Sequence, residues 1–183
     1  MTANPHASRP ASVRAKKVHR SDDRETEPET RSYLQPGKLF VGRGQVSVKT
    51  VLGSCVAVCI WDGERAVGGM NHYLLPLRTS QANGAARFGE IAIRSLLSEL
   101  ERLGARQAAL KARVYGGACV VDSLRKRGAG IGPRNIELAI RMLGALRIPI
   151  VSQDVGGRVG RRVVFRVGDG AVWTRYLDEG RKR

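Results

Sequence analysis

The stretch TVLGSCVAVCIWDGERAVGGMNHYLLP, residues 50–76, contains two short apolar runs with a turn signal between them. The first run, Val56 to Trp61, is rich in residues that favour strands, and Asp62-Gly63 is a dipeptide typical of tight turns. Val67 to Tyr73 has the composition of the return strand. The sequence therefore predicts a β-hairpin, in which the beginning of the first run lies next to the end of the second.

A cysteine and a histidine stand at those two positions. Cys55 directly precedes the first run and His72 lies near the end of the second, so we expect a thiol and an imidazole to be neighbours. A nucleophilic cysteine needs a base or backbone N–H groups that favour its thiolate, together with access for a substrate. Gly53 and Ser54 form a corner before Cys55 whose exposed amides can also serve as an oxyanion hole. The spacing is therefore that of a nucleophile with its base.

The cysteines also allow a purely structural interpretation. A free cysteine in an apolar strand is usually an inert small hydrophobic residue, and this is our interpretation of Cys59 and Cys119. For Cys55, the residues alone leave both interpretations open. A zinc site built from the three cysteines and His72 matches no usual ligand spacing, and the glycine pairs of the chain lack the phosphate-binding pattern. We therefore expect neither a metal nor a cofactor.

His72 is the only histidine after residue 32, since the other two belong to the N-terminal segment. A single histidine beside Leu74 and Leu75 is often a structural residue, whereas a general base usually has a third group that orients it. Thr50, on the strand before Cys55, is the nearest polar candidate for that third group. Asp154 is a more distant carboxylate candidate.

Length and composition indicate one folded domain after an N-terminal tail. The chain has 183 residues and 42% hydrophobic content, enough for one core without disulfides or metals. Residues 1–32 contain almost no large apolar side chain and are predicted to be a disordered tail, and residues 33–183 to be a single domain. Three cysteines outside any CxxC pair and an N-terminus without an apolar signal run favour a reduced, cytoplasmic setting. No apolar run is long enough to predict membrane insertion.

The positive charge belongs to the predicted domain. The chain has a net charge of +16, and residues 33–183 hold 25 Lys and Arg against 11 Asp and Glu, a net of +14. Such a field attracts polyanions and acidic proteins. A nucleic-acid partner is disfavoured because the sequence has no basic stripe interleaved with aromatic residues. An acidic protein partner fits the same charge.

The rest of the chain alternates between strand and helix patterns. A period of two over Gln45 to Val51 predicts a half-buried strand. Apolar residues at helical spacing predict one helix from Phe88 to Leu103, ended by Gly104, and a second over Ile136 to Leu143. Further strands are predicted at 108–115, 148–152, 163–167 and 171–173, with a turn at 154–157. The pattern predicts a mixed α/β architecture in which helices pack against sheet.

Five short motifs occur in order along the chain. They are Leu52-Gly53-Ser54-Cys55-Val56, Gly68-Gly69-Met70-x-His72-x-x-Leu75-Pro76, Tyr115-Gly116-Gly117-Ala118, Ile131-Gly132-x-x-Asn135 and Asp154-x-Gly156-Gly157-x-x-Gly160-Arg161. Together they resemble the CheD family of chemoreceptor glutamine deamidases, over about residues 35 to 175. The resemblance implies an α/β fold, a mixed β-sheet sandwich flanked by helices.

The same resemblance implies an activity. The protein would be a cysteine hydrolase that converts chemoreceptor glutamines to glutamate, with Cys55 as nucleophile, His72 as base and Thr50 as the third catalytic residue. Backbone donors around Gly53 and Ser54 would hold the oxyanion while a thioester forms. Methyl glutamate esters would be side substrates. The implied substrates are the acidic cytoplasmic helices of chemoreceptors.

A second interpretation is a binding module without catalysis. The resemblance also implies association with a CheC-type phosphatase, in which case the protein would act chiefly as a regulator. Intact Cys55 and His72 permit catalysis without proving it, so the sequence leaves this choice open.

Overall fold

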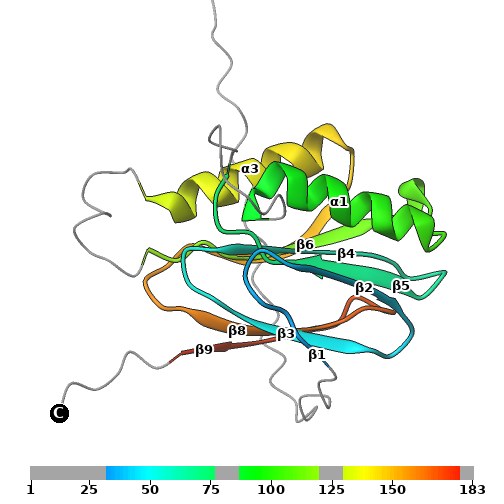
Figure 1. Ribbon diagram of the computed structural model, residues 1–183, viewed down its shortest axis with the longest axis horizontal. Coiled ribbons are helices and arrows are strands. Elements are labelled where there is room, and N and C mark those ends of the chain that lie inside the picture. Colours follow the sequence, from blue (N-terminus) through cyan, green and yellow to red (C-terminus); the bar gives the residue numbers. More distant parts are fainter. Residues whose placement is uncertain (1–31, 77–86, 120–129, 178–183) are drawn as a thin grey trace, which may run out of the picture.

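The computed structural model describes residues 32–76, 87–119 and 130–177, and these residues form three layers. Two helices form one outer layer, a five-stranded sheet lies in the middle, and a four-stranded sheet forms the other outer layer (Figure 1). Each sheet contains parallel and antiparallel pairs. The predicted mixed α/β sandwich is confirmed. The tail predicted for residues 1–32 lies outside the described residues, except for Ser32, where the first strand begins.

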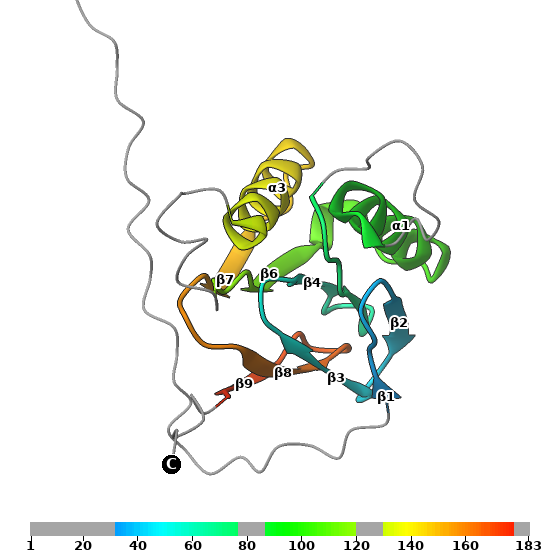
Figure 2. The ribbon, with the colours of Figure 1, turned by 60° about the vertical axis from the view of Figure 1, so that its left-hand side comes forward.

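The middle sheet has the strand order β2-β5-β4-β6-β7 and the outer sheet the order β1-β3-β8-β9. The middle strands are β2 (Leu39–Arg43), β4 (Val56–Asp62), β5 (Val67–Asn71), β6 (Lys111–Gly116) and β7 (Ile150–Val155). The outer strands are β1 (Ser32–Tyr33), β3 (Ser47–Leu52), β8 (Arg161–Arg166) and β9 (Val172–Tyr176). The helices are α1 (Gly89–Arg102), the short 3₁₀ helix η2 (Gln107–Ala109) and α3 (Ile131–Ala145). Figure 2 shows α1 and α3 over the same face of the middle sheet.

The predicted hairpin is formed by β4 and β5, which pair antiparallel with Cys59 opposite Met70. Beyond β5 the two segments meet again at an isolated bridge, where Val56 and Tyr73 exchange backbone hydrogen bonds of 3.1 and 3.0 Å. The beginning of β4 therefore lies next to the residues that follow β5, as the sequence predicts.

Strand β4 separates the two apolar cores of the protein, and all of its residues are buried. Val56, Val58 and Ile60 belong to the core under the helices. Ala57 and Cys59 belong to the core between the two sheets. Because successive side chains of a strand point to opposite faces, a strand buried on both faces is apolar throughout. This explains the short apolar run that dominates the sequence here.

The glycine pair Gly68-Gly69 in β5 allows close packing on the middle sheet. A Cβ at Gly68 would lie 2.2 Å from the Val167 carbonyl oxygen, which follows β8 in the outer sheet. A Cβ at Gly69 would lie 2.7 Å from Leu96 Cδ1, on α1. Neither distance leaves room for a methyl group, so β5 accepts its neighbours only because it lacks side chains at these two positions.

Some predicted element boundaries are wrong, although both helices, the hairpin and the remaining strands are confirmed. The strand predicted at 108–115 begins only at Lys111, because η2 occupies the residues before it. The strand predicted at 148–152 is β7, which continues through Asp154 and Val155 in parallel pairing with β6. The turn predicted at 154–157 therefore begins at Gly156, and Gly156 and Gly157 adopt φ of 75° and 81°, a region that favours glycine.

We predict opposite effects for two glycine-to-alanine substitutions. Gly69→Ala forces a shift of Leu96 or of the β2 backbone and should lower the free energy of unfolding by about 1–3 kcal/mol. Gly144→Ala, in α3, meets nothing within 4 Å and should leave that free energy unchanged or raise it by up to about 1 kcal/mol. Urea unfolding of both variants, followed by circular dichroism, measures the difference. Equal effects of the two substitutions would contradict the packing described for β5.

Candidate active site

Thr50 and His72 meet across the space between the two sheets. Thr50 lies in the middle of β3, fully buried, with its side chain on the inner face of the outer sheet. Its Oγ1 is 2.8 Å from His72 Nδ1 and 2.8 Å from the Leu34 carbonyl oxygen. A hydroxyl has one proton, and a carbonyl can only accept, so Thr50 donates to Leu34 and accepts from the Nδ1–H of His72. This hydrogen-bond pair fixes the tautomer of His72, leaving the lone pair on Nε2.

The imidazole of His72 is held in place as a neutral base. Its backbone N–H donates to the Lys38 carbonyl at 3.0 Å, and its carbonyl accepts from Gly37 N–H at 2.7 Å. Burial lowers the pKa of His72 to about 4, with a smaller opposing effect of the Leu34 carbonyl. Within the described part of the chain, Nε2 makes no hydrogen bond. The lone pair that a general base needs is therefore uncommitted.

Cys55 lies beside His72 on the same face of the middle sheet. Val56 and Tyr73, which pair directly, both point into the core under the helices. The residues before them, Cys55 and His72, therefore point the other way, toward the space between the sheets. Cys55 packs against the core between the two sheets. The predicted neighbourhood of thiol and imidazole is confirmed at the level of the backbone. No hydrogen bond joins Sγ to Nε2.

Burial sets the resting state of the cysteine. It raises the pKa of the Cys55 thiol, and a hydrogen bond from the backbone N–H of Cys55 to its own sulfur opposes this rise. Because the pKa of His72 is lowered and that of Cys55 is raised, the two groups rest as a neutral thiol and a neutral imidazole. An attack by Cys55 thus requires that its proton pass to a base during the reaction.

The loop that contains Cys55 is fixed by three consecutive carbonyl groups. The Gly53 carbonyl accepts from Ala118 N–H at 2.8 Å, and the Cys55 carbonyl accepts from Gly117 N–H at 2.7 Å. The Ser54 carbonyl between them accepts from the side-chain Nδ2 of Asn135 at 3.1 Å. These partners come from the segment after β6 and from α3. The nucleophile is therefore held by two elements distant in sequence.

Glycines at the end of β6, directly after it and in α3 allow these segments to pack closely against the loop that contains Cys55. A Cβ at Gly116 would lie 2.3 Å from the Cys55 carbonyl oxygen, and one at Gly117 2.5 Å from Ile136 Cγ1. A Cβ at Gly132 would lie 2.4 Å from the Gly117 carbonyl oxygen. Gly116 and Gly117 also have positive φ, 103° and 70°. The sequence motifs around these glycines therefore mark the contact of β6 and α3 with the nucleophile loop.

The other candidate residues have different surroundings. Asp154 accepts hydrogen bonds from the buried Arg161 and from the Tyr176 hydroxyl, so it serves the β7–β8 connection rather than His72. Cys59 is fully buried in the core between the sheets, and burial raises the pKa of its thiol. Cys119 is half-buried. The described residues contain no group of three or more His, Cys, Asp or Glu side chains that could hold a metal ion.

Sequence reasoning missed Asn135 as a part of this site. The motif Ile131-Gly132-x-x-Asn135 by itself predicts no role for its last residue. A polar side chain at an otherwise helical, buried position is the signal that marks it, because Asn135 is 0% exposed. A buried amide must find partners, and here two of them are backbone carbonyls beside the site.

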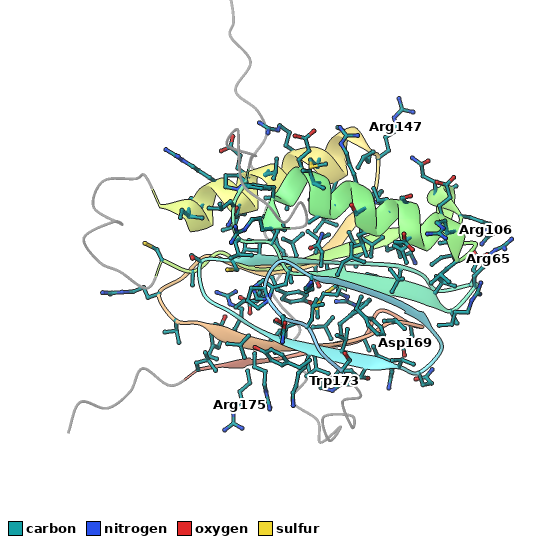
Figure 3. All side chains as sticks on the ribbon, viewed as in Figure 1. Arg65, Arg106, Arg147, Asp169, Trp173 and Arg175 are labelled. Carbon is teal, nitrogen blue, oxygen red and sulfur yellow. The ribbon has the colours of Figure 1, made fainter. Side chains whose placement is uncertain are left out.

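Four arginines lie on different parts of the protein surface. Figure 3 shows Arg147 projecting from the helix layer, Arg65 and Arg106 at one end of the middle sheet, and Arg175 from the outer sheet. These side chains point in different directions and form no single stripe. No helix in the described ranges is both long and apolar enough to span a membrane.

Known proteins resemble this chain over most of its length. A family model described as "CheD chemotactic sensory transduction" matches residues 74–176. The Anaeromyxobacter dehalogenans protein "Probable chemoreceptor glutamine deamidase CheD 1" is 47% identical, over 79% of this chain and 84% of that protein. A Trichlorobacter lovleyi protein named "Probable chemoreceptor glutamine deamidase CheD" is 42% identical, over 79% of this chain and 89% of its own. The solved structure of a DUF152 protein from Neisseria meningitidis covers 71% of this chain and 64% of its own at 10% identity, with a TM-score of 0.44.

The neutral resting pair predicts how alkylation of Cys55 depends on pH. In a Cys119→Ser background, the rate with iodoacetamide should rise continuously through pH 9, because a raised thiol pKa delays formation of the thiolate. No plateau is expected between about pH 5 and 8, because His72 has no charge there to stabilise a thiolate. Mass spectrometry of the alkylated fraction over time gives the rate at each pH. A rate that is constant above about pH 5 would instead indicate an imidazolium–thiolate pair.

Proposed function

Because this chain belongs to the CheD family, we propose that it is a protein-glutamine glutaminase that deamidates glutamine side chains of chemoreceptors to glutamate. The relatives named above are chemoreceptor glutamine deamidases by name. The observation that most supports the same activity here is the arrangement of Thr50, His72 and Cys55. It supplies a nucleophile, a base with a free lone pair, and a group that orients the base.

The first half of the reaction forms a thioester. Nε2 of His72 accepts the proton of Cys55 as Sγ attacks the side-chain amide carbon of the glutamine. The carbonyl oxygen becomes an oxyanion, for which the backbone N–H groups of Ser54 and Cys55 are the candidate donors. His72 then returns the proton to the amide nitrogen, the C–N bond breaks, and ammonia leaves. A γ-glutamyl thioester on Cys55 remains.

The second half hydrolyses that thioester. His72 takes a proton from a water molecule that attacks the same carbon, and the same N–H groups hold the new oxyanion. The C–S bond breaks, the proton on His72 returns to Sγ, and the side chain leaves as glutamate. Thr50 accepts from the Nδ1–H throughout and so keeps Nε2 toward the reacting atoms.

Because Cys55 and His72 are both neutral at rest, protonation of His72 during the reaction costs free energy. A buried imidazolium is costly, since burial is what lowers the pKa of His72. Thr50 gives it a hydrogen bond without the negative charge that a carboxylate would give. We therefore infer that His72 holds the proton only between its uptake from sulfur and its delivery to the leaving nitrogen. Both proton transfers occur at one atom, Nε2, which needs no rotation of the ring.

The surroundings of the site suit a side chain presented on an acidic helix. A Cβ at Gly53 would meet nothing within 4 Å, so the space next to the nucleophile loop is open. The net positive charge favours encounter with the acidic receptor helices that the family resemblance implies.

Three narrower predictions accompany this proposal. A methyl glutamate ester presents the same acyl carbon to Cys55, so methylesterase activity is expected as a side reaction. Because the expected substrates are the cytoplasmic helices of chemoreceptors, we expect the enzyme to be cytoplasmic. Binding to a CheC-type phosphatase remains a prediction from the family resemblance, and a purely regulatory role would leave Cys55 without effect on receptor glutamines.

Deamidation can be measured on a receptor cytoplasmic fragment by mass spectrometry, because conversion of glutamine to glutamate adds about 1 Da. We predict that the wild-type protein converts defined glutamines and that Cys55→Ala abolishes conversion, since no other thiol can form the thioester. Cys119→Ala, which removes a half-buried cysteine outside the proposed mechanism, should retain the wild-type rate. Conversion by Cys55→Ala at the wild-type rate would exclude the mechanism.

A further inference from the structure

The side chain of Asn135 connects the segment before the nucleophile to the segment after the base. Asn135 lies in the first half of α3 and is fully buried. Its Nδ2 donates one proton to the Ser54 carbonyl at 3.1 Å and the other to the Leu74 carbonyl at 2.9 Å. Because both partners are carbonyls, only the amide nitrogen can face them, which fixes the orientation of the amide.

These two carbonyls lie beyond the same end of the antiparallel bridge between Val56 and Tyr73, one on each segment. Ser54 precedes Cys55, and Leu74 follows His72 and Tyr73, so each carbonyl belongs to a segment that bears one member of the catalytic pair. The amide of Asn135 is inserted between them and takes the place of a direct contact between the two segments. One side chain thereby sets the spacing between the cysteine loop and the histidine segment.

The bond to Ser54 also aims a donor at the reacting atoms. In a trans peptide, the C=O of one residue and the N–H of the next point in opposite directions. When Asn135 holds the Ser54 carbonyl, the N–H of Cys55 must point away from α3. The N–H of Cys55 therefore lies on the face of this peptide opposite Asn135, where it is a candidate donor to an acyl group attacked by Cys55.

Of the three consecutive carbonyls in this loop, only that of Ser54 depends on a side chain. Backbone N–H groups of Gly117 and Ala118 hold the carbonyls of Cys55 and Gly53, and no side-chain substitution removes them. The peptide that bears the Cys55 N–H is thus the one whose orientation a single substitution can release.

We propose that Asn135 is a positioning residue, which holds the Ser54–Cys55 peptide so that the Cys55 N–H stabilises the oxyanion formed when Cys55 attacks an acyl group. As a step in deamidation, this inference rests on the proposed function. The role of the N–H itself applies to any acyl transfer to Cys55 and can be tested without a receptor.

Packing alone does not account for an asparagine at this position. Its Oδ1 is buried and has no hydrogen-bond partner among the described residues, and an apolar side chain would avoid the cost of burying it. The helix itself is anchored independently, because the Tyr73 hydroxyl donates to the Asn135 backbone carbonyl at 2.5 Å. What the side chain adds is the pair of hydrogen bonds to Ser54 and Leu74.

Two reagents separate oxyanion stabilisation from simple reactivity of the thiol. Acylation of Cys55 by p-nitrophenyl acetate forms an S–C bond through a tetrahedral oxyanion and releases p-nitrophenolate, whereas alkylation by iodoacetamide displaces iodide without any oxyanion. Both rates are measured in a full-length Cys119→Ser background, with Cys55→Ala as the blank. Asn135→Ala should lower the acylation rate at least about 10-fold and change the alkylation rate less than about threefold.

A matched control is available at the far end of β4. Asp62 is also fully buried, and its carboxylate accepts from the backbone N–H groups of Glu64, Arg65 and Arg106, so it holds loops together as Asn135 does. Asp62→Ala should lower stability without changing the ratio of the two rates. If Asn135→Ala lowers both rates in parallel or leaves both unchanged, the proposed positioning role is wrong.

A second variant addresses a loss of folding. Asn135→Asp keeps the shape of the side chain and removes the two donor hydrogens, so it should lower acylation selectively as well. Circular dichroism confirms that each variant is folded at the assay temperature. A selective effect on acylation in a protein that leaves receptor glutamines unchanged would contradict the proposed function and retain the inference. If the wild-type protein deamidates receptor glutamines but neither Asn135 variant lowers acylation selectively, the proposed function is supported and the inference about Asn135 is wrong.

Discussion

The hydrogen bond from His72 Nδ1 to Thr50 Oγ1 links the two sheets at the point where the chemistry takes place. It depends on the whole sandwich, because Thr50 belongs to the outer sheet and His72 follows a strand of the middle sheet. Leu34, whose carbonyl oxygen accepts a hydrogen bond from the Thr50 hydroxyl, belongs to the segment after β1. The tautomer of His72 is therefore determined by three chain segments. Separation of the two sheets would break the hydrogen bond that orients the His72 ring, whereas the backbone of His72 would still be held by Gly37 and Lys38.

Burial keeps Cys55 and His72 uncharged, so the site does not rest as a thiolate–imidazolium ion pair. The environment disfavours both the imidazolium of His72 and the thiolate of Cys55, so both groups are uncharged at rest. Hydrogen bonds of fixed direction replace stabilisation by charge: Thr50 orients the base, and the Ser54–Cys55 peptide presents a donor to the substrate. Such an arrangement protects the thiol from non-specific reaction. It also makes catalysis depend on geometry, which explains the extent of the hydrogen bonding around Gly53 to Cys55.

Local sequence patterns predicted the hairpin and both helices because they report local physical constraints. The apolar run of β4 and the Asp62-Gly63 turn were sufficient to place Cys55 and His72 on neighbouring segments. The contact of Thr50 with His72 could only be suggested, since the spacing of two sheets is not encoded in either strand alone. Asn135 was recognised as a motif and not as a partner of Ser54, because its contacts span 81 residues and require the docking of α3. The boundary that was wrong at Asp154 depends on the pairing of β7 with β6, and the one before Lys111 on the short 3₁₀ helix η2.

The proposed chemistry depends on the tautomer of His72, which can be observed directly. In ¹⁵N-labelled protein at neutral pH, two-bond correlations from the ring protons report the protonation of each imidazole nitrogen, and a His72→Gln variant identifies the signals. We predict that His72 is neutral with its proton on Nδ1 and a bare Nε2, and that Thr50→Val removes this preference. A proton on Nε2, or a doubly protonated ring at neutral pH, would contradict the account.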